Sequence, residues 1–298
     1  MRVAAVDLGT NSTRLLVADV DDGQVDEVVR RLTITRLGQG VDAHSRLLPA
    51  AVERLHACLE RYHAESTALR AERSLAIATS AVRDAENGSD LLREIELRYG
   101  FTTRLLSGGE EAALTLRGVS SGHELSKGTL LLDIGGGSTE LVLGGENGEV
   151  AFSASLQLGC VRLTERYLGS DPPTGAELER CAEAVRNALP ELEPACAIGV
   201  AGTVTTIAAL DLGLDVYDPV RIHGHRIRVA AVERELARLA GLAVVERRNI
   251  PGLEPDRAPV IVGGAAILRE VLRAYELDEI EASERDILHG AALAAAGL

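Results

Sequence analysis

Apolar and polar positions near the start of the chain are arranged as three successive strands. An apolar run at residues 3–6 ends in a glycine turn and is followed by a second strand pattern at residues 13–20. The segment Asp21-Asp22-Gly23 then predicts a tight turn into a third strand-like run at residues 24–35. Together these strands predict a β-meander. Beyond it the apolar spacing becomes that of a helix, at Val52, Leu55, Leu59 and Tyr62.

The same order of elements recurs in the middle of the chain. Strand patterns at residues 129–132, 139–143 and 150–156 are joined by glycine turns at 135–137 and 145–148. Thr174 is placed to cap a helix whose apolar positions are Leu178, Cys181, Val185 and Leu189. The glycine turns align without a gap, because VDLGTNSTRLL at 6–16 matches LDIGGGSTELV 126 positions later. The sequence therefore predicts two homologous α/β halves, each opening with a β-meander and an Asp-x-Gly turn.

Strand and helix patterns alternate through the rest of the chain. Strands are predicted at residues 75–79, 101–106, 197–200 and 260–262, and helices at 90–98, 110–117, 204–210, 230–240, 265–275 and 284–295. His223 and His225 are placed on one face of a strand, where structural roles are favoured over a metal site because no further ligand cluster completes one. A linker-like stretch at 120–128 predicts the domain boundary. The expected domains are residues 1–122 and 123–285, followed by a C-terminal helix at 286–298.

The composition fits a folded protein of two domains. The 298 residues are 46% hydrophobic and 26% charged, which is enough apolar sequence for a sizeable core. No apolar run is long enough to span a bilayer, and residues 1–7 enter a strand pattern directly, without the layout of a signal peptide. The four cysteines are scattered without a C-x-x-C pair, so we expect reduced thiols in a soluble, cytoplasmic protein.

The net charge and the aromatic content argue against two classes of binding partner. The formal net charge of −14 argues against nonspecific binding to nucleic acid or to a membrane surface. The aromatic content of 2%, with no tryptophan, leaves little for stacking of bases. We therefore expect neither nucleic acid nor membrane as a partner.

The two Asp-x-Gly turns are suited to phosphate. Glycine lets an anion approach several consecutive backbone N–H groups, and the neighbouring hydroxyl and amide groups add donors. Aspartates at strand ends can hold Mg²⁺ or Mn²⁺, directly or through water, which neutralises phosphate charge. One such turn is equally compatible with a capped hairpin, whereas a duplicated pair favours phosphate binding. The predicted phosphate ligands are Gly9, Thr10, Asn11, Ser12, Gly135, Gly136, Gly137, Ser138 and Thr139, and the predicted metal ligands are Asp7 and Asp133.

The paired motifs resemble the phosphate loops of the actin-like ATPase superfamily. More closely, DLGTNSTRLL, ATSAVRDAEN, LSGGEEAAL, DIGGGSTEL and GVAGT resemble, in order and spacing, motifs of the exopolyphosphatase/guanosine pentaphosphate phosphohydrolase family. The resemblance spans almost the whole chain, whose length is similar to that of the short, two-domain members. It implies an α/β fold of two similar actin-like (ribonuclease H-like) domains with a cleft between them. It also implies a homodimer and a C-terminal helix packed on the first domain.

The LSGGEEAAL motif carries two adjacent glutamates. Ser107 and Glu110 have the S-x-x-E spacing of a capping box, so Glu110 is expected to bond a backbone N–H. Glu111 is then expected to point elsewhere and to be the glutamate of the pair that serves the chemistry. The second glutamate of the pair is catalytic in the family, so the resemblance implies that Glu111 is a general base that orients and deprotonates the attacking water. It also implies a metal-binding role for Glu140, which the residues alone describe equally well as a solvent-facing strand residue.

Other polar residues gain a role only from the resemblance. Arg83 follows a predicted strand and, in isolation, is typical of a surface ion pair, but the family motif implies a phosphate ligand. Gly202 and Thr203 resemble the superfamily's third loop, near the far end of the ligand, although an ordinary strand-to-helix turn has the same pattern. Arg14 replaces the first-copy equivalent of Glu140, and structural and phosphate-binding roles stay open for it. Arg257 is compatible with a basic channel for a long polyanion or with a solvated loop.

The leading functional prediction is Mg²⁺-dependent hydrolysis of the terminal phosphate of inorganic polyphosphate. The alternative within the family is removal of the 5′ terminal phosphate of guanosine pentaphosphate, because both substrates end in the same phosphoanhydride. An actin-like kinase acting on a small metabolite is a different class, but the chain lacks room for the large inserted subdomains that bind sugars. A non-catalytic sensor of nucleotide or polyphosphate is a third class, and the presence of Glu111 argues against it.

Overall fold

The computed structural model describes residues 1–121, 125–146 and 149–298. Contacts divide the chain into two compact units: unit 1 is Met1–Glu124 with Arg285–Leu298, and unit 2 is Leu125–Glu284. The boundary expected between residues 122 and 123 lies outside the described residues, as do positions 147 and 148 of the turn expected at 145–148. Both units combine a sheet with helices, so the predicted α/β class is confirmed.

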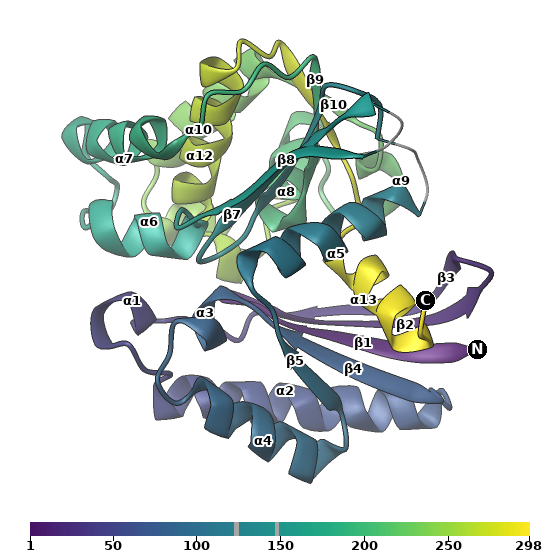
Figure 1. Cartoon of the computed structure of the whole chain (residues 1–298). Coiled ribbons are helices and arrows are strands. Elements are labelled where there is room, and N and C mark those ends of the chain that lie inside the picture. The colour runs from purple at the N-terminus through teal and green to yellow at the C-terminus, as the bar shows by residue number, and fades with distance from the viewer. Residues whose placement is uncertain (122–124, 147–148) are drawn as a thin grey trace. The chain divides into compact units, whose positions relative to one another are not determined.

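Unit 1 contains, within the described residues, a five-stranded sheet with the order β3-β2-β1-β4-β5 (Figure 1). The predicted meander is present, since β2 (Thr13–Asp21) pairs antiparallel with both β1 (Arg2–Leu8) and β3 (Gln24–Thr33). β4 (Arg73–Ala78) is parallel to β1, and β5 (Thr102–Leu105) is parallel to β4. The carboxyl ends of these three strands therefore lie at one edge of the sheet.

Helices cover both faces of this sheet. Ala4, Val6 and Leu8 of β1 pack with α2 (Pro49–Ala68) and α4 (Gly88–Tyr99). The alternate positions Val3 and Ala5 pack with α5 (Gly108–Ser120) and α13 (Ile287–Ala296) on the other face. Because side chains alternate along a strand, Asp7 shares the face of α5 and α13. The short helices are α1 (Val41–His44) and α3 (Ser80–Arg83).

The helices α5 and α13 approach each other at two glycines. A Cβ atom on Gly118 of α5 would lie 1.9 Å from the carbonyl oxygen of Asp286. A Cβ atom on Gly290 of α13 would lie 2.0 Å from the carbonyl oxygen of Leu114. No side chain fits at either position without movement of the backbone, so these glycines set the distance between the two helices.

Unit 2 contains, over the residues described for it, a six-stranded sheet with the order β10-β11-β9-β6-β7-β8. Its meander consists of β6 (Thr129–Ile134), β7 (Thr139–Gly144) and β8 (Val150–Leu156). β9 (Cys196–Val200) is parallel to β6. β11 (Glu279–Ala282) is parallel to β9, and β10 (Arg226–Arg228) is antiparallel to β11.

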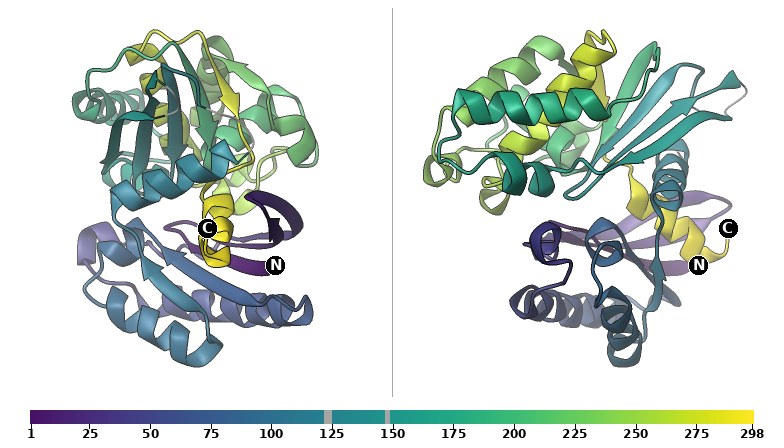
Figure 2. Two further views of the ribbon diagram at one scale, coloured as in Figure 1. Left: turned by 45° about the vertical axis from the view of Figure 1, so that its right-hand side comes forward. Right: turned by 60° about the vertical axis from the view of Figure 1, so that its left-hand side comes forward.

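The long helices of unit 2 share one core with the sheet. Leu130, Leu132 and Ile134 of β6 pack into a cluster that includes residues of all five of these helices. Figure 2 shows the helices of this unit beside its sheet. The five are α6 (Cys160–Tyr167), α7 (Gly175–Ala188), α8 (Ala201–Asp211), α10 (Val229–Ala240) and α12 (Ile261–Ala274). The short helices are α9 (Pro219–Ile222), α11 (Val244–Arg247) and the 3₁₀ turn η2 (Pro255–Arg257). Because Asp133 alternates with these apolar positions, it lies on the opposite face of β6.

The helix caps expected at Ser107 and Thr174 are confirmed. Ser107 and Glu110 form the expected capping box at the start of α5, and Thr174 forms one with Glu177 at the start of α7. Each pair satisfies backbone N–H groups that a helix start leaves without a partner. Gly100 ends α4 with a φ of +69°, a conformation that favours glycine.

Two predictions of secondary structure are wrong. The strand expected at 260–262 does not form, because α12 begins at Ile261; a short apolar run does not distinguish a buried strand from a buried helix. His223 and His225 are not on a strand, since His223 ends α9 and Gly224 has a φ of +80° before β10 begins. Their expected structural roles are confirmed: His223 accepts a bond from the Glu284 N–H at 3.3 Å, and His225 pairs with Asp211 at 2.9 Å.

None of the four cysteines, all of which lie within the described residues, forms a disulfide bond. Cys58, Cys160 and Cys181 are buried and Cys196 is exposed, and all four are free thiols. Over residues 1–121, 125–146 and 149–298, no helix combines the length and the apolar character needed to cross a membrane.

Candidate active site

Two glycine turns at equivalent positions in the two units are closed by the same backbone hydrogen bond. Loop 1 (residues 9–12) joins β1 to β2, and loop 2 (residues 135–138) joins β6 to β7. In loop 1 the N–H of Gly9 donates to Ser12 O at 3.1 Å. In loop 2 the N–H of Gly135 donates to Ser138 O at 3.0 Å. The repeat seen in the sequence therefore corresponds to a repeated structure.

The carbonyl oxygens of loop 1 are engaged by a neighbouring segment. Thr10 O accepts from the N–H of Gly38, and Asn11 O accepts from the N–H of Arg36, both over 2.8 Å. Gly38 sits close to the loop, because a Cβ atom there would lie 2.2 Å from the Thr10 methyl group. With its acceptors occupied, the loop offers mainly donors to a ligand, which favours an anion.

The start of α6 and one side chain hold the carbonyl oxygens of loop 2. The N–H of Cys160 donates to Gly135 O at 3.0 Å, and the N–H of Val161 donates to Gly136 O at 2.9 Å. Arg162 Nε donates to Gly137 O at 2.7 Å. The sequence carried no signal for this role of Arg162, which depends on the chain returning to the loop after β8.

Two buried polar atoms lie unpaired at or just before loop 1. Asp7 Oδ1 and Asn11 Nδ2 are shielded from solvent and have no hydrogen-bond partner among the residues that the structure describes. Leaving such an atom unpaired costs about 1–3 kcal/mol. A cation at Asp7 Oδ1 and an acceptor such as a phosphate oxygen at Asn11 Nδ2 would remove this cost, so the two atoms fit the predicted binding role.

Arg83 and Glu111 meet at the sheet edge that carries loop 1. Loop 1, α3 and α5 follow the carboxyl ends of β1, β4 and β5, which are adjacent in the sheet. Arg83 Nη1 donates to Leu106 O at 2.7 Å and to Glu111 Oε2 at 3.2 Å. Arg83 Nη2 is buried without a partner in the described part of the chain. Arg83 thus orients the carboxylate of Glu111, the expected general base. The contact of Arg83 with phosphate stays a prediction, and Nη2 is the atom that could make it.

The two adjacent glutamates have different surroundings. Glu110 is exposed and accepts bonds from the Ser107 N–H at 2.9 Å and from Arg104 at 2.6 Å. The backbone bond from Ser107, followed by the contact with Arg104, lowers the pKa of Glu110 to about 2. Glu111 is 7% exposed and is held by Arg83. The prediction that Glu110 serves the helix start is confirmed, which leaves Glu111 as the glutamate placed for chemistry.

The residues opposite the two strand-end aspartates differ in charge. Asp7 faces Arg14 across β1 and β2, and Arg14 Nη2 lies 2.7 Å from Asp7 Oδ2. Burial raises the pKa of Asp7, and the charge of Arg14 opposes that rise. Asp133 faces Glu140 across β6 and β7, and Ser155 Oγ donates to Glu140 Oε1 at 2.6 Å. The first strand pair therefore carries a carboxylate opposite an arginine, whereas the second carries two carboxylates.

This donor set fits a magnesium ion. Within the described ranges, no group of three or more His, Cys, Asp or Glu side chains is placed to hold a metal. Mg²⁺ does not need one, because it commonly binds one or two carboxylates and keeps waters or phosphate oxygens as its other ligands. Asp133 and Glu140 supply such a pair in unit 2, and Asp7 Oδ1 is an unused oxygen in unit 1.

Loop 3 (residues 201–203) starts α8 directly after β9, which is adjacent to β6. Ala201 has a φ of +64°, a strained conformation for a residue with a side chain. The guanidinium group of Arg257 packs on Gly202, where a Cβ atom would lie 1.8 Å from Nη1. Thr203 is buried beneath it. Arg257 is 9% exposed, so the solvated-loop alternative for this residue is wrong.

The chain is similar to known proteins over almost its whole length. A family model described as the Ppx/GppA phosphatase family matches residues 16–296, and the chain belongs to this family. It is 41% identical to Exopolyphosphatase 2 of Mycobacterium tuberculosis over 99% of each chain. It is 31% identical to the guanosine-5′-triphosphate,3′-diphosphate pyrophosphatase of Vibrio vulnificus, over 92% of this chain and 55% of that one. The crystal structure of an exopolyphosphatase-like protein, 34% identical, superposes with a TM-score of 0.90 over 98% of each chain.

Proposed function

We propose that the protein is an exopolyphosphatase that releases the terminal phosphate of inorganic polyphosphate in the presence of Mg²⁺ or Mn²⁺. The observation that carries the proposal is the contact between buried Glu111 and half-buried Arg83, at the sheet edge that also carries loop 1. Similarity to Exopolyphosphatase 2 over the full length supports the choice of substrate. The acidic composition supports a cytoplasmic protein without nucleic acid or membrane partners, and the family resemblance supports a homodimer.

Each group has a defined task in the proposed reaction. Glu111 orients a water molecule and accepts its proton as the oxygen attacks the terminal phosphorus. The bond from phosphorus to the bridging oxygen breaks, and the shortened polyphosphate leaves with the electron pair. Because the transition state of phosphoryl transfer is loose, positioning and charge stabilisation contribute most of the catalysis. A metal ion held by Asp133 and Glu140 would neutralise charge at the phosphate oxygens. The N–H groups of loop 1 hold the polyphosphate in line with the attacking water.

Guanosine pentaphosphate is the second candidate substrate. The similarity to the Vibrio vulnificus pyrophosphatase supports it, and its terminal phosphoanhydride presents the same group to Glu111. The low aromatic content argues against a stacking site for guanine, although an arginine can take that role.

The test is phosphate release with Mg²⁺ from short polyphosphate, long polyphosphate, guanosine pentaphosphate and ATP. Glu111→Gln is expected to fold and bind substrate but to lose at least about 10²-fold in kcat. Glu110→Gln is the matched control, because glutamine also completes a capping box, and it should keep its activity. Faster release from the nucleotide would favour the second substrate. Full activity in Glu111→Gln, or no release from any substrate, would overturn the proposal.

A further inference from the structure

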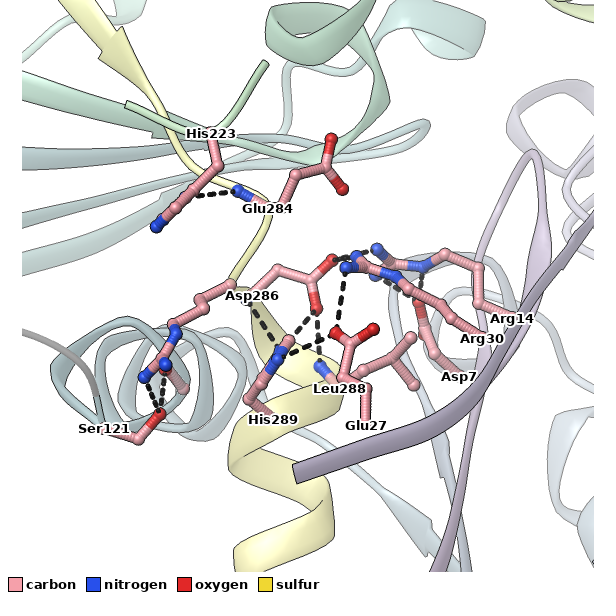
Figure 3. A network of polar contacts seen from close by, with 12 residues as sticks. Asp7, Arg14, Glu27, Arg30, Ser121, His223, Glu284, Asp286, Leu288 and His289 are labelled. Carbon is pink, nitrogen blue, oxygen red and sulfur yellow. Dashed lines mark hydrogen bonds and ion pairs between the residues drawn. The ribbon is translucent and has the colours of Figure 1, made fainter. Parts of the chain in front are cut away.

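Asp286 lies at the first turn of α13, buried in a network of charged side chains (Figure 3). Its Oδ1 accepts the N–H of Leu288 at 2.9 Å, which caps the helix. Its Oδ2 accepts from Arg14 Nη1 and, at 2.9 Å, from Arg30 Nη2. The same carboxylate therefore starts a helix and binds two arginines of the adjacent sheet.

Arg14 connects Asp286 to the strand end that carries loop 1. Its Nε and Nη2 both donate to a single oxygen, Asp7 Oδ2, at 3.0 and 2.7 Å. Its remaining side, Nη1, is bound to Asp286. Asp7 Oδ1 has no partner in the described ranges, although it is buried. The guanidinium group thus spans two carboxylates and leaves one oxygen of Asp7 unused.

The position of Asp286 is fixed by its surroundings. The close approach at Gly118 and Gly290 sets α13 against α5. Burial opposes ionisation of Asp286, but Arg14 and Arg30 outweigh it and hold the pKa of that carboxyl below its usual range. On the same helix turn, His289 Nε2 lies 3.0 Å from Glu27, a second contact between α13 and the sheet. Asp286 is therefore a charged anchor and is held rigidly.

We propose that Asp286 is a positioning residue that keeps one oxygen of Asp7 available to the ligand of the active site. An arginine prefers to bind a carboxylate side-on, with two parallel bonds to its two oxygens. By holding Nη1, Asp286 keeps Arg14 on Oδ2 alone. Without this contact the guanidinium group of Arg14 rotates and donates hydrogen bonds to both oxygens of Asp7. The inference rests on the proposed function, because that function gives Asp7 its ligand.

The variant that tests this is Asp286→Asn. Asparagine is as good a helix N-cap as aspartate, so the start of α13 is retained and only the charge is lost. A crystal structure of the variant is expected to show Arg14 bonded to both oxygens of Asp7. Mn²⁺ binding to the substrate-free protein, followed by the electron paramagnetic resonance of free Mn²⁺, should weaken by about tenfold, as for other outer-sphere partners of metal ligands. The kcat for polyphosphate should fall in parallel, with KM changing less.

Arg30→Gln is the matched control, because Arg30 also binds Asp286, whereas Arg14 is the arginine that spans Asp286 and Asp7. It is expected to keep the Arg14 geometry and the Mn²⁺ affinity. If Asp286→Asn fails to fold, the double variant Asp286→Asn/Arg30→Gln removes one charge of each sign and should show the same turn of Arg14. Arg14 remaining on Oδ2 alone in either variant, or Arg30→Gln weakening Mn²⁺ binding equally, would overturn the proposal. Failure of the proposed function has a different signature, namely no phosphate release by the wild-type protein.

Discussion

Replacing Gly290 by alanine tests the contact between the helices that carry Glu111 and Asp286. The new Cβ atom would lie 2.0 Å from Leu114 O and 2.8 Å from Leu114 C. Real Cβ contacts are not shorter than 3.0 Å, so the helices must separate by about 1 Å. The obstacle is helix backbone and not a flexible side chain, so it cannot turn aside.

The expected loss of stability follows from two opposing contributions. Overpacking of this kind costs about 1–3 kcal/mol, and the rigid neighbour places this site at the upper end. Alanine returns about 1 kcal/mol through its helix propensity relative to glycine. The net loss is therefore about 2 kcal/mol, which corresponds to a fall in Tm of about 4–8 °C for a domain of this size.

Thermal and urea unfolding followed by circular dichroism measure this change. Gly109→Ala is the control in the same unit, because a Cβ atom at Gly109 of α5 meets nothing within 4 Å. That variant should match the wild type or exceed it by up to about 1 kcal/mol. If Gly290→Ala unfolds at the wild-type temperature, the close packing of α5 and α13 does not constrain the protein, and the rigid anchoring of Asp286 loses its basis.

Two further predictions concern pH and metal. The pKa of Glu110 is lowered, so its ionised form stabilises the folded protein above the ordinary glutamate range, and this stabilisation is lost as pH falls toward about 2. Wild type should therefore need more urea to unfold than Glu110→Gln at pH 7, and the two midpoints should converge near pH 2; a constant difference would contradict the assignment. Asp133→Asn should raise the Mg²⁺ concentration for half-maximal phosphate release by at least about tenfold, and an unchanged titration would remove Asp133 from the metal site.

The elements that the sequence predicts well are those that depend on short-range patterns. The two meanders follow from alternating residues and glycine turns, and the capping boxes at Ser107 and Thr174 follow from a spacing of three residues. The separate surroundings of Glu110 and Glu111 could also be predicted, because one side chain of the pair is used by the cap. By contrast, the apolar run at 260–262 has no local feature that distinguishes strand from buried helix.

Contacts between distant segments could not be predicted in this way. Asp286 binds Arg14 across 272 positions of sequence, and Arg83 binds Glu111 across 28. Arg162 reaches loop 2 only because the chain returns to it after β8. Such partners depend on strand order and helix packing, which residue periodicity does not encode.

The duplication places an equivalent aspartate in each half, and the residue that faces this aspartate differs between the halves. Both strand ends place an aspartate beside a glycine turn, and the residue opposite lies seven positions later in each copy. In unit 2 that residue is Glu140, so two carboxylates face each other, which is the kind of pair proposed to hold the metal ion. In unit 1 it is Arg14, which on its own would neutralise Asp7 and occupy both of its oxygens. A second carboxylate, Asp286, divides the arginine between two partners. In the role proposed for Asp286, the oxygen of Asp7 that stays available for a ligand depends on the C-terminal helix being part of unit 1.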